Sequence, residues 1–354
     1  MVSLLRGVEP LSNPGGSHDA SLFVQRAGQE PEKAGLFGRD PAFIRRLVPL
    51  IARYVSFFQP EVRHIERVPE SGPVLVVGNH SSTFYMPDMW ITTLAILARR
   101  GLKQPEYILT HDAFLMVPGL RGVLSRLGSI PAGEKEAEAA LSNQALLLVY
   151  PGGDYEACRP WSERDRIDFA GRKGFVKLAL RAQVPVVPVV AHGAQHTVVV
   201  FSRGERLARA FGLHRLRAKV LPIVLGPPFG VTAIPPPPMP AAITVEFLPP
   251  LDWTDLGADA ASDEAVVEAC YKEITGMMQA TLDRLSAEHP HPLLRGVTQL
   301  VLHGPAHIEV PVPDERPQTR RCRSTAHRFL QRETPPAHEH LNTNALPAHR
   351  CGQG

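Results

Sequence analysis

The chain has 354 residues, of which 44% are hydrophobic and 21% are charged, and its formal net charge is +3. This composition is typical of a globular protein of one or two domains, and a small charge without basic runs among aromatic residues argues against nucleic acid as a partner. The cysteines lack CxxC spacing, which argues against a zinc site or a disulfide framework and favours a reducing cytoplasm; they are Cys158, Cys270, Cys322 and Cys351.

The sequence predicts neither a signal peptide nor a membrane span. Residues 1–15 lack the apolar core of a signal peptide, and no window of the sequence reaches the roughly 18 uncharged apolar residues that cross a bilayer. Residues 1–38 have no periodicity and predict a flexible segment. Over 41–58, apolar residues recur at helical spacing with arginines on another face. Such a helix packs on a domain, lies in a membrane interface, or does both, and Pro49 predicts a kink or a break in it.

Strands and helices alternate from residue 73 to residue 248, which predicts one α/β domain over 39–295. Short apolar runs predict buried strands at 74–77, 106–109, 145–150, 185–190, 219–225 and 243–248, with a short strand or turn at 128–131. Periodic segments predict helices at 113–127, 134–141, 170–182 and 264–285. The prolines of 185–190 favour the margin of the sheet. Residues 296–354, rich in Pro, His and Arg, predict a disordered tail.

The segment 74–88 carries the strongest indication of a functional site. A buried strand is followed by a polar turn that contains His80, and Pro87 opens a helix with Asp88 in its first turn. Open α/β sheets bind ligands at the carboxyl ends of their strands, and a histidine oriented by a carboxylate is suited to general-base catalysis. The alternative is structural: Asp88 complements the helix dipole, and His80 bonds to the turn backbone.

Two more loops follow predicted strands, at 151–156 and 192–196. If the three strands are neighbours, the three loops meet at one edge of the sheet and form a cleft. The pair Gly152–Gly153 is either a plain tight turn or a backbone that can approach a ligand oxygen. His192 and His196 lack the glutamate of an HExxH site, so we expect no zinc. GxSxG, GxxxxGK[ST] and GxGxxG are absent, which leaves a serine-hydrolase elbow and the common nucleotide sites unsupported.

Four motifs in one order resemble the glycerolipid acyltransferase superfamily. They are GNHSS (78–82) before a Pro-Asp, YPGG (150–153) with the following Glu156, GRKGFVKLAL (171–180) and VPVVPV (184–189). That superfamily includes the bacterial lysophosphatidic acid acyltransferases and the branch nearer mono- and diacylglycerol acyltransferases. The resemblance spans about residues 65–250. It implies an α/β fold of the glycerol-3-phosphate acyltransferase type: a single domain with a central mixed, mostly parallel sheet flanked by helices.

The resemblance also implies a mechanism. His80 acts as the general base that takes the proton of an acceptor hydroxyl, which attacks the thioester of acyl-CoA or acyl carrier protein, and Asp88 holds the imidazole. Neither an acyl-enzyme nor a metal or cofactor is needed. The implied substrate-binding residues are Ser81, Ser82, Tyr150, Pro151, Gly152, Gly153, Glu156 and Lys173.

Two departures from the family pattern bear on the site. Seven residues separate His80 from Asp88, whereas the common motif has four and would place the carboxylate at Tyr85. In the third motif, the lysophosphatidate branch reads approximately FPEGTRS, and its Glu and Arg are associated with the glycerol phosphate. Here those places hold Gly152 and Tyr155. This favours a neutral or differently charged acceptor over lysophosphatidate.

Three cations near the third motif leave the acceptor open. The three cations are Arg159, Arg172 and Lys173, and any of them could compensate for the missing arginine. Arg172 and Lys173 could equally belong to a solvated helix face.

We therefore expect a cytoplasmic O-acyltransferase of glycerolipid or phospholipid biosynthesis, peripheral on the inner face of the cell membrane. Its acceptor would be the hydroxyl of a glycerolipid or lysophospholipid. Two alternatives stay open: a thioester or lipid hydrolase that uses the same histidine with water, and a catalytically silent lipid-binding protein on the same scaffold.

Overall fold

The structure is a computed structural model that describes residues 36–80, 85–212, 220–226, 230–233 and 236–308. Most of the predicted flexible N-terminal segment (1–35) and most of the predicted tail (309–354) lie outside the described residues. Within the described residues, no helix is both long enough and apolar enough to cross a membrane.

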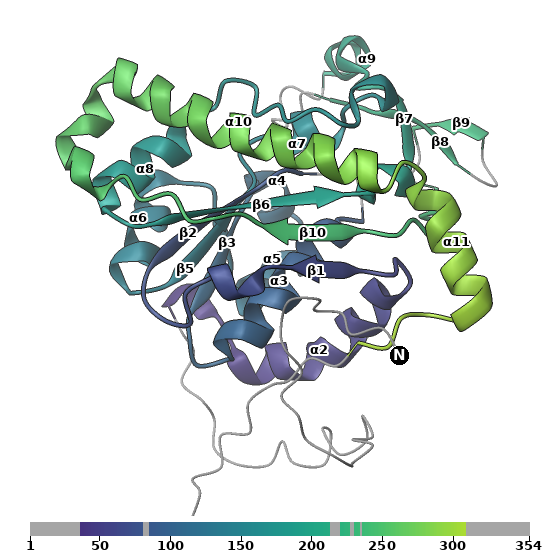
Figure 1. Cartoon of the computed structure of the whole chain (residues 1–354), viewed down its shortest axis with the longest axis horizontal. Coiled ribbons are helices and arrows are strands. Elements are labelled where there is room, and N and C mark those ends of the chain that lie inside the picture. The colour runs from purple at the N-terminus through teal and green to yellow at the C-terminus, as the bar shows by residue number, and fades with distance from the viewer. Residues whose placement is uncertain (1–35, 81–84, 213–219, 227–229, 234–235, 309–354) are drawn as a thin grey trace, which may run out of the picture. The chain divides into compact units, whose positions relative to one another are not determined.

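A seven-stranded sheet forms the centre of the domain, in the order β1-β10-β6-β2-β5-β3-β4 (Figure 1). Neighbouring strands are parallel except for β10 and β6, which are antiparallel. This confirms the predicted mixed, mostly parallel sheet. The strands are β1 (Glu61–Arg63), β2 (Val74–Gly78), β3 (Glu106–Thr110), β4 (Ser129–Pro131), β5 (Leu146–Val149), β6 (Val186–His192) and β10 (Thr244–Phe247).

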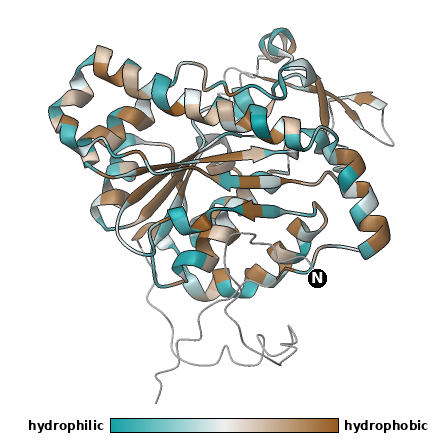
Figure 2. Cartoon of the chain, viewed as in Figure 1, coloured by the Kyte–Doolittle hydropathy of each residue, from teal (hydrophilic) through white to brown (hydrophobic). Residues whose placement is uncertain are grey.

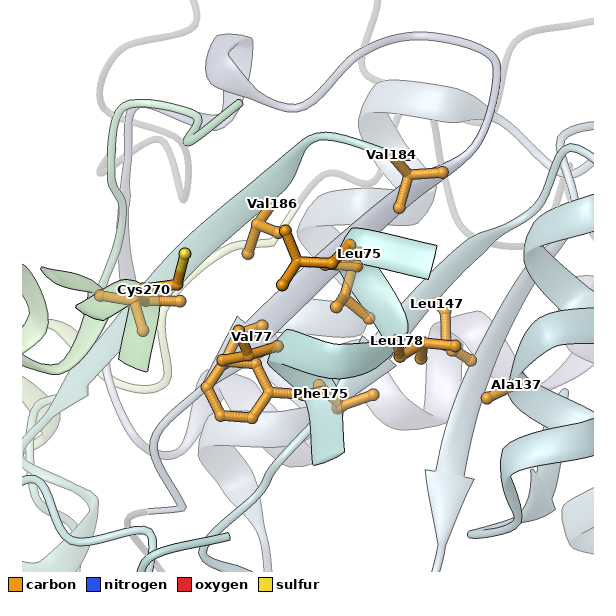
Figure 3. Packing of buried hydrophobic residues seen from close by; sticks show 14 of the residues in the cluster. Leu75, Val77, Ala137, Leu147, Phe175, Leu178, Val184, Val186 and Cys270 are labelled. Carbon is orange, nitrogen blue, oxygen red and sulfur yellow. The ribbon is translucent and has the colours of Figure 1, made fainter. Parts of the chain in front are cut away.

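Helices cover both faces of the sheet because alternate residues of each buried strand point to opposite sides. Leu75 and Val77 of β2 belong to a core cluster with α6 (Glu134–Ser142), α8 (Gly174–Ala182) and α10 (Glu264–Glu288). Figure 3 shows this packing around Phe175 and Leu178 of α8.

The other residues of β2, Val74 and Val76, belong to a second cluster with α2 (Pro41–Ser56) and α3 (Pro87–Arg100). In Figure 1, α10 lies on one side of the strands and α2 and α3 lie on the other. The central strands β2 and β6 are hydrophobic over nearly their whole length, as expected of strands covered on both faces (Figure 2).

A second, three-stranded antiparallel sheet, in the order β7-β8-β9, packs around Val198, Val200 and Val224. Its strands are β7 (Val199–Ser202), β8 (Ile223–Gly226) and β9 (Gly230–Thr232). Further α-helices of the described residues are α4 (Asp112–Leu115), α5 (Leu120–Arg126), α7 (Gly153–Ala157), α9 (Glu205–Ala210) and α11 (Pro292–His303). Short 3-10 turns include η1 (Leu36–Gly38), η3 (Trp161–Glu163) and η4 (Ala194–Thr197).

The expectation that the proline-bearing strand 185–190 lies at a sheet margin is wrong. This strand, β6, lies inside the sheet between β10 and β2. The register of β10 on β6 ends at Phe247 opposite Val189, so Pro188 lies one residue beyond the last pair on that side. Its carbonyl still accepts the Leu248 N–H at 2.8 Å. Pro188 therefore keeps a hydrogen bond through its carbonyl, and its missing N–H lies beyond the last registered pair of β10 and β6.

Other predicted boundaries also moved. α2 is one helix that contains Pro49, held by the buried face of Ile44, Val48 and Ala52. The segment 113–127 forms two short helices, α4 and α5, on either side of Pro118. β8 belongs to the second sheet, not to the central one. α11 runs past residue 296, where we predicted the tail to begin.

Glu106 at the start of β3 gives a test of the core. Burial raises the pKa of its carboxyl to about 7, against the opposing charges of Arg39 and Arg100. The unfolded chain releases this proton near the ordinary glutamate pKa of 4.5 and the folded chain near 7, so the free energy of unfolding falls as pH rises through that window.

We therefore expect Glu106→Gln to change stability little at pH 4 and to raise the free energy of unfolding by up to about 3 kcal/mol at pH 8. Urea unfolding of both proteins at the two pH values measures the difference. A difference that does not depend on pH would contradict this account of the buried carboxyl.

Candidate active site

The predicted meeting of loops at one edge of the sheet follows from the topology. β6, β2 and β5 are adjacent and parallel, so their carboxyl ends lie together. Val77 pairs with Val149, and Gly78 pairs with Val189. His80, Tyr150 and His192 therefore leave neighbouring strands at the same edge, where ligands bind in sheets of this kind.

His80 and Asp88 lie in contact at this edge. The distance from His80 Nδ1 to Asp88 Oδ2 is 3.3 Å, and the two side chains are 12% and 0% exposed. Asp88 reaches this place because α3 begins at Pro87, directly after Met86 in the left-handed region (φ 45°). A buried carboxylate on Nδ1 orients the ring and favours the tautomer whose Nε2 is free to accept a proton.

A buried ion pair holds the backbone of His80. Glu156 Oε2 accepts the His80 N–H at 2.9 Å, and Arg159 Nη2 donates to the His80 carbonyl at 2.7 Å. The two side chains are 3.2 Å apart and are 0% and 1% exposed. Burial raises the pKa of Glu156, against the opposing charge of Arg159. Both polar backbone groups of the histidine are thus fixed from α7 and the residues after it.

The same ion pair reaches a third segment. The other carboxylate oxygen of Glu156 accepts the Asp168 N–H at 3.3 Å, and Arg159 Nη1 donates to the Arg166 carbonyl. Glu156, predicted as a substrate-binding residue, therefore contacts backbone from inside the domain. Sequence reasoning considered Arg159 only as a possible phosphate ligand, and nothing in the sequence pointed to its contact with His80.

The ring of Tyr150 packs beside the imidazole of His80. The two ring centroids are 5.0 Å apart. The approach depends on Gly78, since a Cβ there would lie 2.5 Å from the tyrosine ring. Burial, helped by the charge of Asp88, raises the pKa of the Tyr150 hydroxyl. The ring is therefore a neutral partner for the imidazole.

Asn79 ties the end of β2 to β6. Its side-chain oxygen accepts the Ala191 N–H at 2.8 Å, and its amide nitrogen donates to the Ala191 carbonyl at 3.1 Å. The residue before the histidine is thus fixed to the neighbouring strand. Sequence reasoning assigned Asn79 no separate role, because its partner lies 112 residues further along the chain.

The turn after β5 is held by Arg172, which belongs to the motif GRKGFVKLAL (171–180). Arg172 donates to the carbonyls of Pro151 and Gly152, at 3.1 and 2.9 Å, and lies 3.2 Å from Asp154. Lys173 instead lies 2.7 Å from Glu268 on α10. Ser81 and Ser82, also predicted to bind substrate, lie outside the described residues.

The two histidines after β6 are held by protein groups. His192 Nε2 lies 3.1 Å from the His289 carbonyl, and the ring of His196 contacts Trp161 edge to face. Burial lowers the pKa of His196 to about 3, so its ring is neutral at physiological pH. Within the described residues, no group of three or more His, Cys, Asp or Glu side chains is placed to hold a metal ion.

Residues 59–192 match the family model Acyltransferase. An uncharacterized protein of Mycobacterium tuberculosis is 27% identical over 253 residues, which are 71% of this chain and 69% of the relative. A bovine (Bos taurus) protein named "DGAT1/2-independent enzyme synthesizing storage lipids" is 29% identical over 130 residues, 36% of this chain and 37% of the relative. Phytyl ester synthase 2 of Arabidopsis thaliana is 28% identical over 150 residues, 41% of this chain and 21% of the relative.

One solved structure is also similar. It is the 1-acyl-sn-glycerophosphate (LPA) acyltransferase PlsC of Thermotoga maritima, at 17% identity and a TM-score of 0.45, with 75% of this chain and 88% of the other covered.

The position of Glu156 generates a prediction for Gly152. A Cβ at Gly152 would lie 2.3 Å from both Cβ and Oε2 of Glu156, so Gly152→Ala must displace the carboxylate that holds His80. We expect this variant to lose about 1–3 kcal/mol of unfolding free energy, as overpacked sites do.

Gly174→Ala is the matched control, because a Cβ there meets no atom within 4 Å; its stability should change by no more than about 0.5 kcal/mol. Urea denaturation of both variants measures the effect. Equal stabilities would mean that Glu156 is not fixed where the structure places it.

Proposed function

We propose, from the match of residues 59–192 to the family model Acyltransferase, that the protein transfers a fatty acyl group from a thioester to the hydroxyl of a lipid. The observation that carries the proposal is the contact of His80 with the fully buried Asp88 at the carboxyl edge of the sheet. A histidine whose Nδ1 is held by a carboxylate leaves Nε2 to take a hydroxyl proton, which is the general base that direct acyl transfer requires.

The proposed reaction has two steps. The acceptor oxygen attacks the thioester carbonyl carbon while its proton passes to His80 Nε2, and Asp88 stabilises the imidazolium that forms. The tetrahedral intermediate then expels the thiolate, which takes the proton back from His80. The products are an ester and a free thiol, and no acyl-enzyme is formed. The donor is acyl-CoA or acyl carrier protein.

The contacts of three cations favour an acceptor without a phosphate dianion. Arg159 is buried against Glu156 and holds the His80 carbonyl. Arg172 is bonded to the turn carbonyls and to Asp154, and Lys173 pairs with Glu268. None of the three that could have replaced the arginine of the lysophosphatidate motif is therefore available without breaking a contact.

Two relatives are named for products of related chemistry, storage lipids in one case and phytyl esters in the other. Their names are consistent with a neutral acceptor such as monoacylglycerol, diacylglycerol or a long-chain alcohol. We further propose that the protein works at the cytoplasmic surface of the cell membrane as a peripheral enzyme, because both acyl donor and lipid acceptor partition there.

One prediction of the proposed function concerns the general base, His80. His80→Ala should lower the rate of ester formation at least ~10²-fold, the scale of a positioned general base. His303→Ala, an exposed histidine on α11, is the control and should keep the rate of the parent protein. Thioester consumption with a long-chain acyl-CoA measures both. Full activity of His80→Ala would remove the proposed mechanism.

Another prediction of the proposed function concerns the acceptor lipid. Long-chain acyl-CoA is offered with monoacylglycerol, diacylglycerol, a long-chain alcohol, lysophosphatidate or other lysophospholipids, and the lipid products are identified by mass. We expect esters of the neutral acceptors to form fastest. A preference for lysophosphatidate would overturn the argument from the three cations, and fatty acid released without ester would indicate a hydrolase. An unconsumed thioester would favour a lipid-binding protein.

A further inference from the structure

The segment between β3 and β4 presents apolar side chains to solvent. Phe114, Met116, Val117 and Val123 are 44%, 75%, 47% and 42% exposed, and we call these four residues the α4–α5 apolar surface. No side chain of residues 114–126 belongs to either large core cluster, and α5 contains no buried residue. Side chains with this exposure contribute little to the core of the domain, so several of them close together in the chain indicate an interaction surface.

This surface begins at the same edge of the sheet as the candidate active site. β3 ends at Thr110 and is parallel to β5, which is parallel to β2. The chain therefore leaves β3 on the side where His80 and Tyr150 leave the two strands next in order (Figure 1).

Arginines are the charged residues between Ala113 and Gly133, while Asp112 opens α4 and Asp40 pairs with Arg126. The sequence from Ala113 to Gly133 contains no aspartate or glutamate, and its charged residues are Arg121 and Arg126. α5 packs on the start of α2 through Arg126, whose guanidinium lies over the Phe43 ring at 3.9 Å and 2.7 Å from Asp40. α2 itself, and the chain as far as Pro60, contains arginines and no acidic residue.

We propose that the α4–α5 apolar surface is a docking element for an anionic lipid bilayer. Exposed apolar side chains accompanied by arginines are the pattern of an interfacial segment, whose apolar residues enter the acyl region while arginines meet anionic headgroups. The segment 41–58 does not supply this contact by its apolar face, because Ile44, Val48, Ala52 and Val55 are buried in the core. That lipid acyl chains travel from this surface to His80 rests on the proposed function; the docking does not.

Cosedimentation of the full chain with vesicles tests the docking. We expect binding to phosphatidylcholine vesicles that contain phosphatidylglycerol, and weaker binding without it or in high salt. Met116→Glu with Val117→Glu should lower the bound fraction at least ~10-fold, because two carboxylates would enter the lipid interface. Val301→Glu with Leu302→Glu is the matched control on α11, where the two side chains are 77% and 68% exposed, and it should bind as the parent protein does.

Three results would overturn the proposal. The Met116/Val117 variant could bind vesicles like the parent protein, or the α11 control could lose as much binding. Light scattering could instead show a parent dimer that the Met116/Val117 variant alone converts to a monomer, which would make the surface an interface between two copies of the chain.

Enzyme activity, measured beside vesicle binding, distinguishes a failure of the docking proposal from a failure of the proposed function. The Met116/Val117 variant should lose activity on acceptors embedded in vesicles and keep it on short-chain substrates that are free in solution. His80→Ala should bind vesicles normally. A parent protein that binds vesicles through this surface and consumes no thioester would defeat the proposed function and leave the docking proposal standing.

Discussion

The buried ion pair of Glu156 and Arg159 is the contact on which the geometry of the candidate site depends. Removing two charges from water costs several kcal/mol for each ion, and their mutual attraction repays this only when further hydrogen bonds complete the pair. Here the further bonds are made to backbone: the His80 N–H and carbonyl, the Asp168 N–H and the Arg166 carbonyl. An apolar pair of the same volume would fill the space but could not fix the orientation of a peptide group.

This arrangement divides the work of holding the histidine between two carboxylates. Glu156 acts on the backbone of His80 and Asp88 acts on its ring, so the side chain is constrained at both ends. Two glycines nearby also help to place His80, because neither has a Cβ atom. Gly78 leaves room for the Tyr150 ring, and Gly152 leaves room for Glu156. Much of the YPGG motif therefore packs around one imidazole, and its predicted contact with substrate stays a prediction.

The sequence allowed the layers to be predicted and left their lateral order open. Short apolar runs and periodic segments mark strands and helices because burial on two faces or on one leaves a local pattern. The position of β6 inside the sheet could not be predicted in this way. A strand can hold a proline there only if its neighbour needs no hydrogen bond from the proline nitrogen, and this depends on where the pairing with β10, a strand distant in sequence, ends. The contact of Glu156 with His80 was hidden for a similar reason. The two residues are 76 positions apart, and a glutamate beside Gly-Gly looks like a ligand-binding residue.

The same limit explains why the sequence left two roles open for the segment 41–58 and indicated no lipid contact for the segment after β3. An amphipathic helix has one sequence pattern whether its apolar face meets a core or a bilayer. In α2 that face fills the second core cluster, where Val48 and Val55 are 4% and 0% exposed. Residues 114–126 have the shorter and more interrupted helices, yet Met116 is 75% exposed. Burial therefore separates the two segments, because the apolar face of α2 is used by the core and the apolar side chains of residues 114–126 are left to solvent, which is the observation on which the docking proposal rests.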